Sequence, residues 1–220
     1  SNGDFEREAG TYNGTGYLEW NSGGAFNQAN GAGATAMTIP YLVVSADLTL
    51  GQEEMMTVTD TLSVGNADID IDGGSGDDSS YLTVGNGTAR PKVIITNSNA
   101  SVSDAEISFV VGQEPDYEFA GAGIINPVST TLWPTTMTAH NLYIEMTANV
   151  AVVIDDNRSM SGDLYLTQGE LSMEDNDTLT ATGTTITRTS NSSIDLDHDN
   201  DATDGTGAFV AGDVDLVYKD

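Results

Sequence analysis

Two short patterns with alternating apolar residues recur along the chain. Asn141-Leu-Tyr-Ile returns as Asp163-Leu-Tyr-Leu, and Leu62-Ser-Val-Gly-Asn returns as Leu82-Thr-Val-Gly-Asn. Alternation of this kind predicts half-buried strands, because successive side chains of a strand point to opposite faces. Self-similarity with a period of about 20–22 residues is typical of a repeat architecture whose units stack on one another.

A longer version of the scheme occurs twice. Residues 163–187 open with Asp-Leu-x-Leu and continue to Asp-Thr-Leu, and the earlier residues 47–72 do the same. The acidic residues of the later stretch, such as Glu170 and Glu174, fall at its polar breaks and outward positions. We therefore expect them to be solvated residues of a repeat and not catalytic groups.

The predicted fold class is all-β, since no segment shows a sustained helical period. We predict a right-handed parallel β-helix, or solenoid, with coils of about 20–22 residues, because crossovers between parallel strands are right-handed. A β-sandwich is the alternative, since short strands at regular spacing are also its signal. The coil-sized repeat favours the solenoid. Strands are expected at residues 41–44, 48–50, 56–59, 62–64, 69–71, 81–84, 93–96, 107–111, 142–146, 150–154 and 214–218.

The beginning of the chain differs from the rest. Residues 1–36 are rich in glycine and carry aromatic residues, among them Tyr17, Trp20 and Phe26. We predict that this segment caps one end of a solenoid formed by residues 37–220, because an exposed last strand would recruit other chains. A platform on which sugars stack is the alternative for its aromatic residues.

The repeat pattern is interrupted at residues 112–139. This segment holds three of the chain's five prolines, together with Tyr117, Phe119 and Trp133. Proline cannot donate to a central ladder of hydrogen bonds, so we predict a loop insertion. Long loops on rigid scaffolds often carry binding sites, although such a loop can also simply cover a lateral face.

The charge balance is strongly acidic. The chain has 34 Asp and Glu against six Lys and Arg, a formal net charge of −28. Such a polyanion repels nucleic acid and anionic membrane surfaces, and it attracts divalent cations and cationic partners. No apolar run approaches the roughly 18 residues of a membrane span, so we expect no membrane insertion. The chain has no cysteine, which excludes disulfides and thiolate metal sites within it.

The Asp-Leu-x-Leu and Asp-Thr-Leu pattern resembles the parallel β-helix regions of large secreted bacterial surface proteins and adhesins. The resemblance covers about residues 41–111 and 141–190 and rests on repeat texture. It implies a structural or adhesive role outside the cell or at the cell surface. It transfers no function to any particular residue.

An acidic run at residues 68–73 alternates carboxylates with isoleucines, so that on a strand its three aspartates face one way. Its spacing is that of the start of a calcium loop, but the twelfth position is Ser79 and not the glutamate that an EF-hand requires. Residues 73–78 then match the first six positions of the Gly-Gly-x-Gly-x-Asp calcium repeat. The candidate Ca²⁺ ligands here are Asp68, Asp70, Asp72 and Asp78.

A second acidic run occupies residues 195–201. Its four alternating carboxylates repel one another unless they are solvated or neutralised, and hard cations accept such oxygen ligands. Ca²⁺ is the predicted cofactor of both runs, with a hydrated acidic face as the alternative. The candidate ligands in this run are Asp195, Asp197, Asp199 and Asp201.

Catalysis has little support in the sequence. The two histidines, His140 and His198, lie far apart, and there is no Gly-x-Ser-x-Gly elbow and no phosphate-binding loop with a lysine. A polysaccharide lyase would pair acidic calcium ligands with a basic residue, and a glycosidase would use two carboxylates. Nothing in the sequence places Arg90, Lys92, Arg158 or Arg188 beside the acids. We therefore predict no enzyme and name no catalytic residue.

The predicted function is structural or adhesive. We expect a stiff acidic module of an extracellular surface protein, or the subunit of an extracellular filament or layer. Its expected partners are further copies of itself or neighbouring surface proteins. The alternative is a β-helix protein that binds or cleaves carbohydrate, with Trp20, Tyr117 and Trp133 contacting a glycan.

Overall fold

The computed structural model describes most of the chain as strands and connecting turns. The described residues are 5–7, 16–28, 37–51, 54–71, 80–104, 107–125, 128–147, 150–174, 176–183, 185–196, 207–212 and 215–219. Within them no helix is formed, and hence no helix that could cross a membrane. The chain divides into two compact units: unit 1, Ser1–Val93 with Asn99–Gln113, and unit 2, Ile94–Ser98 with Glu114–Asp220.

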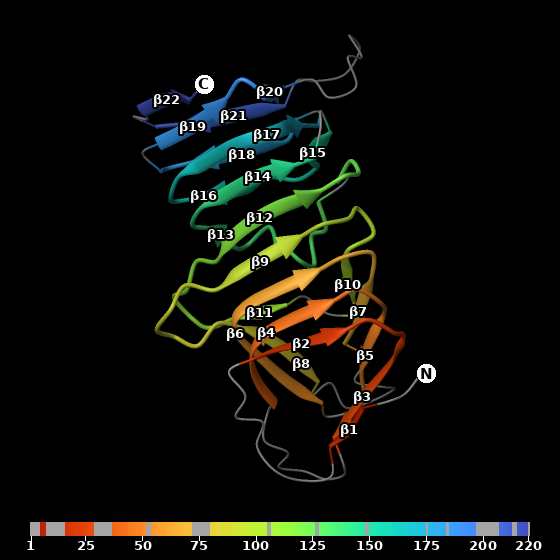
Figure 1. Ribbon diagram of the computed structural model, residues 1–220. Helices are drawn as coiled ribbons and strands as arrows, with labels where there is room; N and C mark the ends of the chain where they lie inside the picture. Colours follow the sequence, from red (N-terminus) through yellow and green to blue (C-terminus); the bar gives the residue numbers. More distant parts are fainter. Residues whose placement is uncertain are drawn as a thin grey trace. The chain divides into compact units, whose positions relative to one another are not determined.

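Unit 1 contains parallel strands in two groups (Figure 1). The first group follows the order β1 (Phe5–Arg7), β3 (Gly24–Gln28), β5 (Leu48–Leu50), β7 (Asp68–Asp70) and β10 (Ser101–Ser103). The second follows the order β2 (Tyr17–Trp20), β4 (Met37–Val44), β6 (Met55–Val64), β8 (Tyr81–Val84) and β11 (Ser108–Phe109). Strand β9 (Lys92–Ile95) begins in unit 1 and ends in unit 2.

The long strand β6 pairs with β4 along both of its halves and with β8 along its first half. Met56 pairs with Leu82 of β8, whereas Leu62 pairs with Leu42 of β4. The repeated Leu-x-Val-Gly-Asn segments that begin at Leu62 and Leu82 therefore do not pair with each other. The stacking implied by that repeat is wrong, because the two segments pair with different strands.

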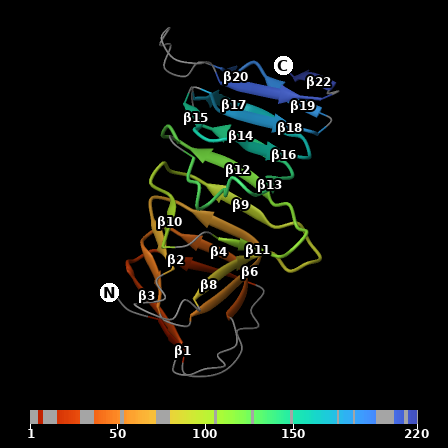
Figure 2. The ribbon, with the colours of Figure 1, turned by 180° about the vertical axis from the view of Figure 1, so that it is seen from behind.

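Unit 2 contains three sets of parallel strands, and the chain visits them in turn (Figures 1 and 2). The first set is β12 (Asp116–Gly121), β14 (Leu142–Met146), the first part of β17 (Leu164–Met173), β19 (Thr185–Thr189) and β22 (Asp215–Lys219). The second is β15 (Ala151–Ile154), the last part of β17 and β20 (Ser192–Asp195). The third is β13 (Thr138–Ala139), β16 (Arg158–Met160), β18 (Thr178–Ala181) and β21 (Ala208–Ala211).

The register in unit 2 confirms the pairing predicted from the Asn141 and Asp163 repeat. Leu142 pairs with Leu164 and Leu164 pairs with Ile186, so each step repeats the offset between the two motifs. These partners form one column of inward-facing apolar side chains, all of them buried. Apolar residues at this spacing thus bury each other, which stabilises the stack by removing apolar surface from water.

Two glycines allow the tight path of unit 2. Gly169 has φ of +96° and lies where β17 passes from the first set of strands to the second. A side chain there would meet Met146 and the carbonyl oxygen of Val150. At Gly183 an added Cβ would overlap the carbonyl group of Gly162, so the two backbones approach too closely for any larger residue.

The segment 112–139, expected as a loop insertion, contributes to the core. Strand β12 lies inside it and pairs with β14. Its aromatic residues Tyr117, Phe119 and Trp133 are buried, and the ring of Trp133 stacks on Tyr117 with centroids 4.7 Å apart. The tyrosine hydroxyl donates to the carbonyl oxygen of Leu132 at 2.9 Å.

Parallel pairing distinguishes this fold from the sandwich alternative. A β-sandwich is built from antiparallel sheets, whereas the strand partners described above run parallel in both units. The strands expected at 48–50, 81–84 and 142–146 have the bounds of β5, β8 and β14. Those expected at 56–59 and 62–64 form the single strand β6.

Candidate functional site

A ladder of side-chain to backbone hydrogen bonds runs along one corner of unit 2. The Oδ1 atom of Asp116 accepts the N–H of Asn141 at 3.1 Å. The Oδ1 atom of Asn141 accepts the N–H of Asp163 at 2.9 Å, and Oδ1 of Asp163 accepts the N–H of Thr185 at 3.1 Å. Each of these residues precedes or opens a strand of the first set, so the repeated polar residue in the sequence motif has a structural role.

The acidic run 68–73 is only partly described. Asp68 and Asp70 lie in β7 with Ile69 buried between them, as predicted. The carboxylate of Asp68 accepts the hydroxyls of Ser101 and Ser103 at 2.5 Å each, so both its oxygens already have partners. Asp72 and Asp78 lie outside the described residues.

The second acidic run begins on β20. Asp195 pairs across the sheet with Ser172, while Asp197, Asp199 and Asp201 lie outside the described residues. Within the described ranges, no three His, Asp or Glu side chains converge as metal ligands would. Since five of the eight candidate ligands fall outside those ranges, calcium binding stays a prediction.

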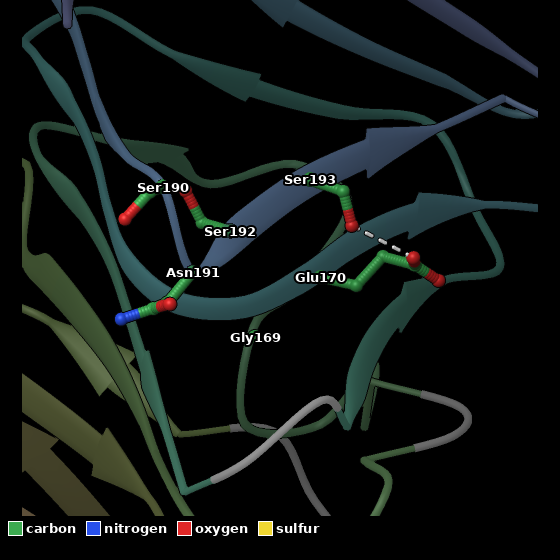
Figure 3. Close-up of a pocket in the computed structure, with 6 residues that line it drawn as sticks. All are labelled: Gly169, Glu170, Ser190, Asn191, Ser192 and Ser193. Atoms are coloured by element: carbon green, nitrogen blue, oxygen red, sulfur yellow. Dashed lines mark hydrogen bonds between the residues drawn. The ribbon is translucent and has the colours of Figure 1, made fainter.

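A polar hollow lies beside the bend of β17. It has a volume of about 410 Å³ and is lined by Gly169, Glu170 and residues 190–193 (Figure 3). The hydroxyl of Ser193 donates to Glu170 Oε2 at 2.8 Å, as the dashed line in Figure 3 shows. The Glu170 carboxylate is therefore already hydrogen-bonded. Among the described residues, no basic side chain and no second acidic side chain lines the hollow. The hollow therefore offers hydroxyl and amide groups without a reactive pair.

A histidine, a serine and a glutamate meet at another point of unit 2. His140 Nδ1 lies 3.1 Å from the Ser161 hydroxyl and 3.7 Å from Glu114 Oε2, and Ser161 also donates to Glu114. Both the hydroxyl and the carboxylate approach the same ring nitrogen. In a nucleophilic triad the serine and the acid use opposite nitrogens of the ring. The cluster thus lacks the geometry that would activate the serine.

An arginine occupies an inward position of unit 2. Arg158 is 2% exposed and pairs across the sheet with the buried Leu179. A charged side chain therefore occupies an inward position of β16, whereas the equivalent position of β18 is apolar. Its guanidinium carbon lies 5.9 Å from the centre of the Trp133 ring, and its Nη2 atom lies 3.8 Å from Asp156 Oδ2. Burial lowers the pKa of Arg158 and raises the pKa of the neighbouring Asp155.

The aromatic residues proposed to contact a glycan are buried. Trp20, Tyr117 and Trp133 are at most 7% exposed. Trp133 donates its ring N–H to the carbonyl oxygen of Met137 and Trp20 donates its own to Asp47, at 3.1 Å in both cases. The alternative in which these three rings form a sugar-binding surface is wrong, because they pack inside the protein.

The last strand of unit 2 leaves apolar side chains in solvent. Leu216, Val217 and Tyr218 of β22 are exposed. They line an apolar groove of about 500 Å³ together with Ile186 and Phe209. Large exposed apolar surfaces of this kind mark interaction sites in soluble proteins.

The chain matches no protein-family model, and no curated protein or solved structure shows significant similarity to it. The evidence on function therefore comes from the chain itself. The sequence predicted a strand at residues 214–218 and, for a filament in which solenoid ends stack, a contact there; it gave no sign of how far each side chain of β22 is exposed. It also gave no sign of the buried Arg158, since arginine is a residue type expected at the surface.

Proposed function

We propose that the chain is a structural or adhesive module that acts outside the cell or at the cell surface. Its fold would be a right-handed parallel β-helix with coils of about 20–22 residues. The observation that carries the proposal is the repeating register of unit 2, in which Leu142, Leu164 and Ile186 stack in one column. The strands of unit 2 also return to the same three sets in the same order, which is what successive coils of such a helix would do.

The architecture supports a mechanical role. Parallel ladders, apolar columns and the hydrogen bonds of Asp116, Asn141 and Asp163 connect each strand of the first set to the next strand of that set. Many weak contacts repeated along one direction resist bending and local unfolding together. A net charge of −28 keeps such a module soluble and attracts divalent cations, which would bridge neighbouring acidic surfaces.

Two experiments test this role. An antibody raised against the chain should label intact cells of the organism that produces it, and protease added outside those cells should destroy the epitope. The purified chain should release no reducing ends from a panel of polysaccharides. An epitope that is protected inside intact cells, or steady turnover of a polysaccharide, would contradict the proposal.

A further inference from the structure

We propose that β22 pairs with β22 of a second copy of this chain, antiparallel and about a two-fold axis at Val217. The inference rests on the proposed structural role and names the partner for its exposed strand. It concerns the edge of β22 that does not face β19, and the apolar groove beside that edge. The described part of unit 2 places no strand on this edge.

The burial of one column shows that the core of unit 2 is open at β22. Leu142 is 0% exposed, Leu164 1% and Ile186 6%, whereas Leu216, their next partner in the same column, is 78% exposed. A leucine in this column is elsewhere covered by another strand. Covering Leu216 would remove apolar surface from water, which is the main favourable term in association.

The sequence of β22 is complementary to itself in one antiparallel register. An axis at Val217 places Asp215 opposite Lys219 of the second copy, and Leu216 opposite Tyr218. Opposite charges and apolar-aromatic pairs stabilise facing strands. Moving the axis by one residue in either direction would place a charged residue, Asp215 or Lys219, opposite Val217.

Parallel pairing of two β22 strands in register is disfavoured by the same residues. It would place Asp215 opposite Asp215 and Lys219 opposite Lys219, and like charges in facing positions destabilise a sheet. The antiparallel arrangement brings the Leu216 and Tyr218 side chains of both copies to one face. That face borders the groove lined by Ile186 and Phe209.

The proposed contact between two β22 strands limits assembly to a dimer. A two-fold interface uses the same surface on both copies and gives a dimer instead of an open chain of subunits. Growth into a filament or layer would need a second, different contact. The net charge of −28 on each copy makes the two copies repel each other. Salt screens this repulsion, with a Debye length of about 8 Å at physiological ionic strength. We therefore expect the dimer to tighten as salt is added.

Sedimentation equilibrium and a single cysteine test the proposal. The chain has no cysteine, so Val217→Cys introduces one thiol at the axis. Facing residues of antiparallel strands have Cα atoms about 4.5 or 5.5 Å apart, which suits a disulfide. We expect Val217→Cys to form a covalent dimer on mild oxidation much faster than Val111→Cys, a control at a position 99% exposed in unit 1.

Charge reversal supplies a second readout that leaves the groove intact. Asp215→Lys alone and Lys219→Asp alone should each weaken dimerisation about tenfold, since two facing pairs become repulsive. The double variant Asp215→Lys/Lys219→Asp should restore it. A chain that sediments as a monomer at every concentration and salt, or equal crosslinking of Val217→Cys and Val111→Cys, would overturn the inference. The proposed function would survive that result, because labelling of intact cells does not depend on dimerisation.

Discussion

The side chain of Asn141 accepts the backbone N–H of Asp163 through Oδ1 at 2.9 Å, although the two residues are 22 positions apart in the sequence. Asp163 repeats the arrangement with Thr185, again 22 positions later. Each side chain therefore satisfies a backbone donor at the start of the next strand in the stack. This bond explains why an amide or carboxylate precedes the Leu-Tyr pair in both copies of the motif.

Replacing Asn141 by alanine removes one rung of this ladder. We expect Asn141→Ala to lower the free energy of unfolding by about 1 kcal/mol, a typical contribution of one hydrogen bond. Asn141→Asp keeps the accepting oxygen and should lose less. The exposed Asn157 provides the control, because surface substitutions are usually within about 0.5 kcal/mol of neutral. Urea unfolding measures all three variants, and equal midpoints for Asn141→Ala and Asn157→Ala would contradict a stabilising ladder.

Gly183 lies against the backbone of Gly162, and a Cβ at this position would overlap the Gly162 carbonyl group. Because the neighbouring atoms belong to the backbone, they cannot rotate away. We expect Gly183→Ala to destabilise the protein by about 3 kcal/mol, at the upper end of the cost of overpacking. Gly123→Ala, where nothing lies within 4 Å of the new Cβ, should change thermal stability little. Similar melting temperatures for the two variants would contradict the close approach of the Gly183 and Gly162 backbones.

Burial raises the pKa of Asp155 above its ordinary value of 3.8. The folded protein then binds this proton more tightly than the unfolded chain does, so ionisation of Asp155 removes stability as the pH rises from about 4 toward the folded-state pKa. Asp155→Asn cannot ionise. The difference in unfolding free energy, wild type minus variant, should therefore fall across this pH range and become level above it. A difference that rises with pH would mean that the folded protein favours the charged carboxylate.

Calcium binding by the acidic run 195–201 can be tested through its effect on thermal stability. If Asp197 and Asp199 are ligands, Ca²⁺ should raise the melting temperature of the chain, since a ligand that binds only the folded state stabilises it. EDTA should reverse the effect, and Asp197→Asn/Asp199→Asn should abolish most of it. Mg²⁺ at equal ionic strength controls for charge screening. An identical response of wild type and variant to Ca²⁺ would remove these residues as ligands.

The sequence was informative where one local signal specifies the pairing. The motifs at Asn141 and Asp163 predicted a register that the structure confirms, because the polar residue and the alternating apolar residues both recur in step. The motifs at Leu62 and Leu82 have the same texture but pair with Leu42 and Met56. A short apolar alternation does not reveal which strand it pairs with, since that depends on where the chain turns.

The burial of Arg158, Tyr117 and Trp133 could not be predicted either, because it depends on contacts between distant segments of the chain. Arg158 of β16 is buried beside Trp133, which belongs to a separate and earlier segment of the chain. Tyr117 and Trp133 looked suited to a loop because prolines flank them, yet their size makes them core residues once β12 pairs with β14. Residue type gives an average environment, and the buried Arg158 departs from it.

The central claim is that successive strands of unit 2 stack in the register set by Asn141 and Asp163, and a disulfide tests it most directly. The rings of Tyr143 and Tyr165 stack with centroids 4.8 Å apart and pair across β14 and β17, while Thr187 is the partner of Tyr165 on the next strand. Mass spectrometry after mild oxidation should therefore find an intramolecular disulfide in Tyr143→Cys/Tyr165→Cys and none in Tyr143→Cys/Thr187→Cys. Equal or reversed crosslinking of the two pairs would contradict the parallel stack.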